Sequence, residues 1–86
     1  MKFASERPLA NIDAAVKKLL EIANAMEADQ AGLIHIGPVN LQFLGAGGGF
    51  LEYRAALTAA IERGYLTLHP SGGYISFTQA GADLFA

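Results

Sequence analysis

The stretch from Phe50 to Phe85 joins a helical pattern directly to two short alternating segments. The helical pattern is FLEYRAALTAAIERG, and the alternating segments are YLTLH (65–69) and YISFT (74–78). Apolar residues at every second position indicate strands, and a four-residue link with two glycines (70–73) favours a tight hairpin. A last half-helix, QAGADLFA, follows the hairpin. The stretch therefore predicts a helix, a β-hairpin and a final helix in direct succession.

The size of the chain limits how its fold can be held together. With 86 residues we expect one domain, residues 1–86, near the lower end of what folds alone. There is no Cys, which excludes disulfides and thiol chemistry, so burial of the 52% hydrophobic content must hold the fold. Much of that content is Ala, and the five Phe and three Tyr must supply most of the core. So small a core favours a dimer that buries more surface.

The first third of the chain predicts an arm followed by a helix. Residues 1–10 carry no periodicity, and we expect an N-terminal arm that becomes ordered only if something docks on it. Asn11 predicts the N-cap of a helix that fades across residues 27–31 and stops at Gly32. Its apolar stripe, at helical spacing, consists of Ile12, Ala15, Val16, Leu19, Leu20, Ala23 and Met26.

The middle of the chain predicts a short strand and a broken helix pair. The β-branched run 33–36 is closed by Gly37-Pro38 and predicts a brief strand. Asn40 is expected to cap one helical turn over residues 41–44. The glycine-rich segment 45–49 has neither the G-x-G-x-x-G spacing nor the G-K-[ST] ending of phosphate-binding loops. It therefore predicts a flexible turn between two helices.

The helix over residues 50–63 has two faces at roughly 100° per residue. We expect Phe50, Leu57 and Ile61 to form the centre of its buried face, flanked by Tyr53, Arg54 and Ala60. The opposite, outward face is expected to present Leu51, Glu52, Ala55, Ala59, Glu62 and Arg63. Gly64 predicts a left-handed end to the helix.

The hairpin and the final turn follow the same kind of pattern. The residues expected to point inward from the hairpin are Leu66, Leu68, Ile75 and Phe77. Tyr65, His69 and Tyr74 are among those expected to point outward. Thr78 is expected to cap the last turn, in which Ala82 and Phe85 lie on one side.

Two motifs in this region resemble the wing of MarR-like and PadR-like winged helix-turn-helix regulators. The motifs are IERGYL (61–66) and ISFTQAGADL (75–84). In those families a helix ends in L-x-x-x-G-hydrophobic, and the second wing strand ends in L-T-x-x-G. The matching residues here are Ile61, Gly64, Thr78 and Gly81, whereas Phe77 stands where those families usually have Leu. The whole chain also resembles short proteins of rhizobia and related alphaproteobacteria, which implies no activity.

The resemblance implies an α+β, winged-helix-like fold. Its three to four helices would accompany a small antiparallel sheet made of the strand 33–36 and the hairpin 65–69/74–78. In those families the helix that precedes the wing enters the major groove of DNA, and the wing contacts the minor groove. The residues placed to contact DNA or a partner are Leu51, Glu52, Ala55, Ala59 and Arg63, with His69 in the wing and Lys17 and Lys18 on the first helix.

Two hypotheses for the function follow from these residues. The first is a small winged-helix, transcription-regulator-like protein that binds DNA weakly. The second is a protein-interaction or homodimerisation module that binds no nucleic acid. The net charge of −2, with six Lys and Arg, argues against a basic DNA-binding face. An intermediate case is a dimer in which Arg7, Lys17 and Lys18 of two copies form the basic surface; Lys17 and Lys18 are otherwise a solvated helix face.

Enzyme activity and metal binding find no support in the residue pattern. His35 and His69 are the only imidazoles and do not form a H-x-x-x-H spacing. The eight acidic residues contain no pair suited to acid and base roles, and no Ser has a nucleophile motif. We expect no enzyme and no cofactor. No apolar run approaches a membrane span, and the start lacks the apolar core of a signal peptide, so we expect a cytoplasmic protein.

Overall fold

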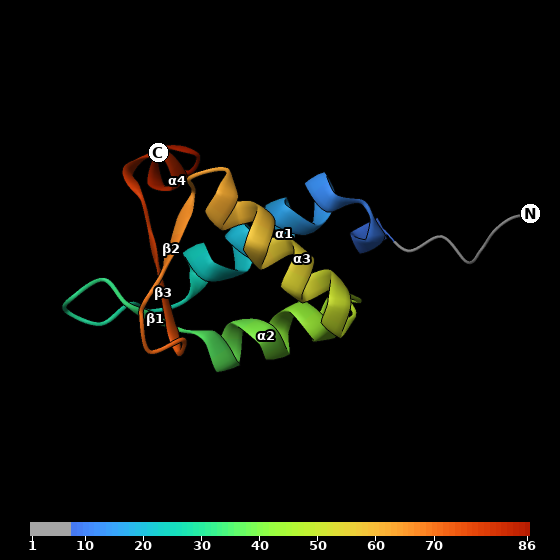
Figure 1. Cartoon of the computed structure of the whole chain (residues 1–86), viewed down its shortest axis with the longest axis horizontal. Helices are drawn as coiled ribbons and strands as arrows, with labels where there is room; N and C mark the ends of the chain where they lie inside the picture. Colours follow the sequence, from blue (N-terminus) through green and yellow to red (C-terminus); the bar gives the residue numbers. More distant parts are fainter. Residues whose placement is uncertain (1–7) are drawn as a thin grey trace, which may run out of the picture.

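A computed structural model of the chain describes residues 8–86 and shows an α+β fold (Figure 1). The elements are η1 (Pro8–Ala10), α1 (Ile12–Ala25), β1 (Ile34–His35), α2 (Ile36–Gly45), α3 (Phe50–Glu62), β2 (Leu66–Leu68), β3 (Tyr74–Phe77) and α4 (Gln79–Asp83). The sheet and α4 lie at one end of the molecule, and the first three helices extend away from them. The α+β class and the small antiparallel sheet are confirmed.

The sheet is antiparallel with the strand order β1-β3-β2. Leu66 pairs with Phe77 and Leu68 with Ile75, while Ile34 of β1 pairs with Ile75 from the other side. The predicted hairpin is confirmed, with strands one or two residues shorter than 65–69 and 74–78. Leu66 and Ile75 are buried, but Leu68 is 45% exposed because it ends an edge strand beside the loop. The strand predicted over 33–36 is only two residues long.

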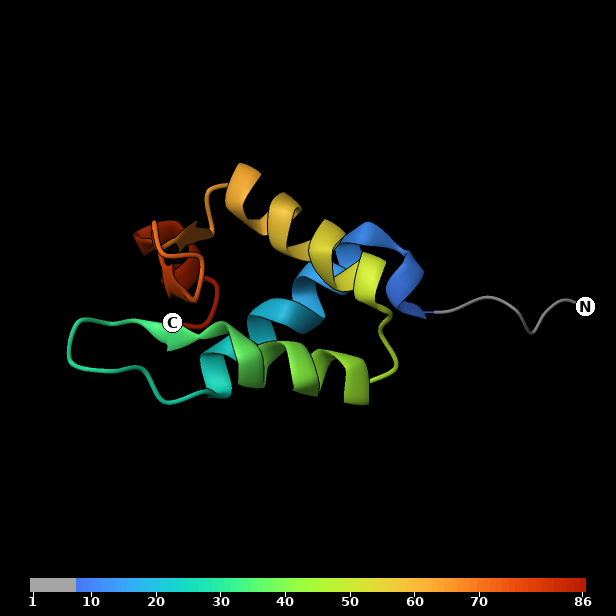
Figure 2. The ribbon, with the colours of Figure 1, turned by 60° about the horizontal axis from the view of Figure 1, so that its bottom comes forward.

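The core lies where α1 passes between α2 and α3 (Figure 2). The Oδ1 atom of Asn11 accepts a hydrogen bond from the Ala14 N–H at 3.0 Å, which confirms the predicted N-cap. Leu19 of α1 is fully buried, as are Val39 and Phe43 of α2. One member of the predicted helical stripe, Ile12, is 39% exposed, and Ile22, which lay outside the predicted stripe, is buried.

The predicted arm before the first helix and the predicted C-terminal end of that helix both need correction. Pro8–Ala10 form a 3₁₀ helix whose Leu9 is buried against α1, so the predicted arm is wrong for these residues; the rest of the arm lies outside the described residues. At the other end α1 stops at Ala25 and does not fade to residue 31. Residues 29–33 form a turn instead, in which Oδ1 of Asp29 accepts hydrogen bonds from the N–H groups of Ala31 and Leu33 at 2.8 and 2.9 Å. Such side-chain bonds favour a turn over a helix.

The second helix is longer than the single turn predicted after Asn40. It begins at Ile36, directly after β1, with His35 in the N-cap position. Gly37-Pro38 therefore lies in its first turn rather than closing a strand. Proline is tolerated there because the N–H groups of a first turn have no partner within the helix. The turn between α2 and α3, predicted from the glycines, is confirmed over residues 46–49.

The buried face of α3 differs from the one predicted. Tyr53 and Ala60, predicted at the flank of that face, are buried together with Ala56, whereas Phe50, predicted at its centre, is 58% exposed. The buried stripe is thus rotated by roughly 80° from the predicted one, given about 100° per residue. Its small alanines let the backbone of α3 approach α1 closely, and α1 is the element that α3 contacts most. The choice of partner therefore placed the alanines inward and the larger Phe50 outward.

A set of hydrogen bonds locks the end of α3 to the last turn of the chain. Gly64 has a φ of +81°, and the N–H of Tyr65 reaches back to the Ala60 carbonyl at 2.9 Å, which confirms the predicted left-handed helix end. The Thr78 hydroxyl donates to the Gly64 carbonyl and accepts from the Gly81 N–H at 3.0 Å. The predicted Thr78 cap is confirmed. The motif residues Gly64, Thr78 and Gly81 are thus parts of one structural contact.

Replacing Tyr53 with Phe should stabilise the fold. Its side chain is 5% exposed, and its hydroxyl has no hydrogen-bond partner among residues 8–86. A buried hydroxyl without a partner costs about 1–3 kcal/mol, so we expect Tyr53→Phe to raise the free energy of unfolding by about 1 kcal/mol at pH 7. Urea unfolding measures this, and a less stable variant would show that the hydroxyl is bonded.

The same side chain makes stability depend on alkaline pH. Burial raises the pKa of Tyr53 above its ordinary value of 10.0. Above that value the unfolded chain loses the proton while the folded chain retains it, so stability falls as the pH rises through 10.0 toward the folded pKa. Tyr53→Phe should remove most of this fall. Tyr74→Phe, which alters a half-buried hydroxyl, is the control and should leave the alkaline fall in place.

Candidate functional site

The exposed side of α3 is the surface on which the sequence placed most contact residues. Leu51 is 76% exposed and Ala55 is exposed as well, as predicted. Together with Arg54, Thr58 and Glu62 they form what we call the outer face of α3. Leu51, Ala55, Thr58 and Glu62 follow one line along the helix, at positions i, i+4, i+7 and i+11. This line contains one carboxylate (Glu62) and one hydroxyl (Thr58). The hydroxyl is its one side-chain group that could donate a hydrogen bond to the edge of a DNA base.

Two of the predicted contact residues lie away from the outer face. The Oε1 atom of Glu52 accepts a hydrogen bond from the Gly49 N–H at 2.7 Å, so this half-buried carboxylate caps its own helix. Ala59 is half-buried and packs against the core. Both were expected on the open side of the helix, and the rotation of α3 about its axis explains why they are not.

Two of the four Lys and Arg residues within 8–86 form ion pairs with carboxylates. The Nη2 atom of Arg63 lies 2.9 Å from Oδ1 of Asp13, and Nζ of Lys18 lies 3.4 Å from Oε1 of Glu21. The guanidinium of Arg54 stands 5.8 Å from the centre of the Phe50 ring. Paired charges attract phosphate weakly, so Arg63 and Lys18 contribute little to a basic face.

His69 is engaged within the hairpin loop. Its Nδ1 accepts a hydrogen bond from the Ser71 N–H at 3.1 Å and lies 2.9 Å from the Ser71 hydroxyl. The ring also contacts Tyr74, with centroids 5.8 Å apart, and His35 contacts the same tyrosine at 4.6 Å. These contacts hold the loop in shape. The loop sequence, residues 70–73, contains no Arg or Lys.

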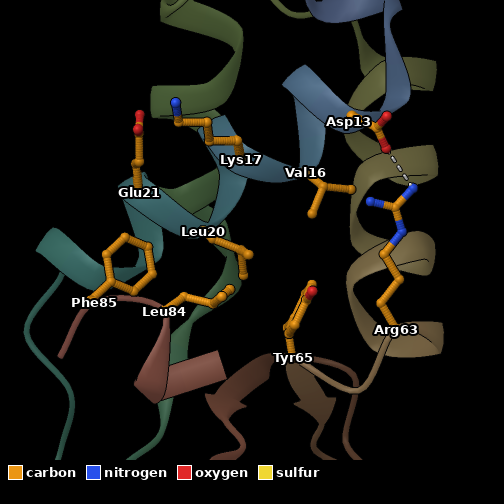
Figure 3. Close-up of a pocket in the computed structure, with 9 residues that line it drawn as sticks. All are labelled: Asp13, Val16, Lys17, Leu20, Glu21, Arg63, Tyr65, Leu84 and Phe85. Carbon is orange, nitrogen blue, oxygen red and sulfur yellow. Dashed lines mark hydrogen bonds and ion pairs between the residues drawn. The ribbon is translucent and has the colours of Figure 1, made fainter. Parts of the chain in front are cut away.

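A cavity of about 320 Å³ brings together two of the predicted residues, Lys17 and Arg63 (Figure 3). It lies between α1, the end of α3 and the C-terminal residues. From α1 it is lined by Asp13, Val16, Lys17, Leu20 and Glu21, and from the rest of the chain by Arg63, Tyr65, Leu84 and Phe85. Sequence reasoning missed the cavity, because Tyr65 was expected on the outside of the hairpin and nothing local indicates that residues 84–85 fold back over α1.

Residues 8–86 contain no group of three or more His, Asp or Glu placed to hold a metal ion. In the same part of the chain, no helix has the length and apolar character needed to cross a membrane. Comparisons with protein-family models, curated proteins and solved structures found no match to this chain. The function must therefore be inferred from the surfaces described above.

Proposed function

We propose that this chain is a non-enzymatic, winged-helix-like domain that acts by pairing with a second copy of itself through the outer face of α3. The order helix, strand, two helices, hairpin and helix supports the winged-helix-like assignment. The observation that carries the function is the 76% exposure of Leu51 beside the small residues Ala55 and Thr58. Phe50, which is 58% exposed, borders this face next to Arg54. Large exposed apolar side chains next to small ones suit close contact with another helix.

Charge complementarity argues for a second copy as the partner. Arg54 and Glu62 are both exposed and stand four residues on either side of Thr58. In a two-fold symmetric contact each residue meets the partner's counterpart reciprocally. Two antiparallel α3 helices that cross at Thr58 would therefore place Arg54 of each copy beside Glu62 of the other. The outer face is apolar and carries no net charge, which favours this reading over DNA binding, for which helix α3 presents Arg54 as its one exposed cation within Phe50–Glu62.

Sedimentation equilibrium of the full chain tests the proposal. We expect a concentration-dependent dimer, since interfaces of ordinary size bind with dissociation constants from roughly micromolar to picomolar. Leu51→Glu should weaken the dimer about 100-fold or more, because an unpaired carboxylate in a desolvated contact costs about 2–5 kcal/mol. The matched control is Leu41→Glu on α2, where the leucine is 70% exposed but lies off the outer face of α3.

Charge reversal tests the antiparallel arrangement separately. Arg54→Glu and Glu62→Arg should each weaken the dimer, and the double variant should restore it, because the pair is re-formed with its signs exchanged. A strict monomer at high concentration, or equal loss in Leu51→Glu and Leu41→Glu, would refute the dimer. A shift of bulk genomic DNA at low salt would instead favour the DNA-binding hypothesis, since non-specific affinity is the least that such a protein should have.

A further inference from the structure

The charged groups around the cavity beside α1 compensate one another. The lining contains two carboxylates, Asp13 and Glu21, and two cations, Lys17 and Arg63, so it carries no net charge. Asp13 holds Arg63 at 2.9 Å, and Glu21 lies 3.4 Å from Lys18. Lys17 extends away from Arg63, and its amine lies beside Glu21 (Figure 3). A charged ligand would lose hydration there without meeting an unopposed charge, so the cavity favours a neutral molecule.

Apolar side chains form most of the remaining wall. Val16 and Leu20 line the cavity from α1, and Leu84 and Phe85 close the opposite side. Leu84 and Phe85 are 53% and 38% exposed, so a molecule laid between them and α1 would remove apolar surface from water. The ring of Phe85 packs edge-on against Phe77, with the ring centroids 6.0 Å apart, which fixes this side of the cavity.

One polar group inside the cavity has no partner. The hydroxyl end of Tyr65 points into it, toward Val16 (Figure 3), and forms no hydrogen bond with residues 8–86. A phenol donates one hydrogen bond, so a ligand with an acceptor oxygen would satisfy it. The volume of about 320 Å³ lies at the lower end of the roughly 300–1,000 Å³ typical of ligand sites, which limits the ligand to a small molecule.

We propose that this cavity binds a small neutral molecule with an apolar chain and one carbonyl oxygen, a ketone of medium chain length. The carbonyl accepts the hydrogen bond of the Tyr65 hydroxyl, and the chain lies along Leu20 toward Leu84 and Phe85. The cavity shares no lining residue with the outer face of α3, so the site does not depend on dimerisation.

Titration of the full chain with 2-octanone, followed by ¹⁵N-edited NMR, tests the site. We expect saturable shifts at Val16, Leu20, Tyr65 and residues 84–85. Octanoate and octylammonium have the same chain length and opposite charges. Each should bind about tenfold more weakly, because neither ion finds an unopposed counter-charge in the lining. Equal or tighter binding of either ion would overturn the proposal.

Two variants test the contacts of the ketone. Tyr65→Phe keeps the ring and removes the hydroxyl, and it should weaken 2-octanone about three- to tenfold. Leu84→Ser removes apolar wall and should weaken it about fivefold. The matched control is Leu41→Ser, which changes a more exposed leucine of α2 outside the lining and should leave the affinity within about twofold.

Three results of these measurements would contradict the site. They are equal losses in Leu84→Ser and Leu41→Ser, an unchanged affinity in Tyr65→Phe, and the absence of saturable shifts at the lining residues at millimolar 2-octanone.

Discussion

Replacing Gly81 with Ala should destabilise the fold more than any other single methyl group placed on a glycine in an α-helix of this chain. A Cβ at Gly81 would lie 2.1 Å from the backbone carbonyl oxygen of Tyr65 and 3.0 Å from the Phe77 ring. The carbonyl cannot yield, because it accepts the Thr78 N–H at 3.1 Å. Overpacking of this kind costs about 2–3 kcal/mol, which corresponds to a loss of roughly 10–20 °C in Tm for a domain of this size.

Gly45→Ala is the control for this prediction. Gly45 ends α2, has no left-handed φ, and a Cβ there would meet nothing within 4 Å. Alanine costs less conformational entropy than glycine in a helix, so Gly45→Ala should be neutral or more stable by up to about 1 kcal/mol. Thermal melts of both variants by circular dichroism give the comparison. Similar melting of Gly81→Ala and the parent chain would mean that the contact between the last turn and Tyr65 is loose.

Gly48→Ala should be destabilising in the parent chain and much less so when Phe43 is shortened. A Cβ at Gly48 would lie 2.1 Å from Cε1 of Phe43. That ring is fully buried and packs edge-on against Tyr53 at 5.7 Å, so it has no room to turn aside. We expect Gly48→Ala to cost about 1–3 kcal/mol. Phe43→Val, which removes the clashing ring atoms, should itself cost about 2–4 kcal/mol.

The double variant distinguishes this clash from a general weakness of the loop. The alanine methyl can occupy part of the space left by the ring, so the combined cost should fall short of the sum by about 1–2 kcal/mol. Gly45→Ala in the Phe43→Val background is the matched control and should be additive. Urea unfolding of the four members of each cycle measures the coupling. Additivity in the Gly48 cycle would show that the loop moves away from the ring.

Short-range chemistry explains what could be predicted from the sequence. Asn11, Gly64 and Thr78 each act on backbone groups within a few residues, and each performs the predicted capping role. The hairpin and its inward Leu66 and Ile75 follow from alternation along a few residues. A cap or turn that depends only on neighbouring residues forms in the same way however the remainder of the chain packs.

Long-range packing decided what could not be predicted. The rotation of α3 depends on how closely α1 approaches it, and the ion pair between Asp13 and Arg63 joins residues 50 apart in the chain. The early start of α2 reflects the pairing of β1 with β3, which places His35 at a helix N-terminus. The cavity forms because Leu84 and Phe85, far from α1 in the sequence, fold back against that helix. None of these arrangements has a local pattern that would identify it.

The sheet order β1-β3-β2 has a consequence for biosynthesis. Both outer strands take their hydrogen bonds from β3, which is the last strand to leave the ribosome. Ile34 and Leu68 both pair with Ile75, so neither strand has its partner until β3 has been synthesised. Unpaired strand edges are prone to intermolecular pairing, and the brevity of β1 and β2 limits that risk until translation delivers their shared partner.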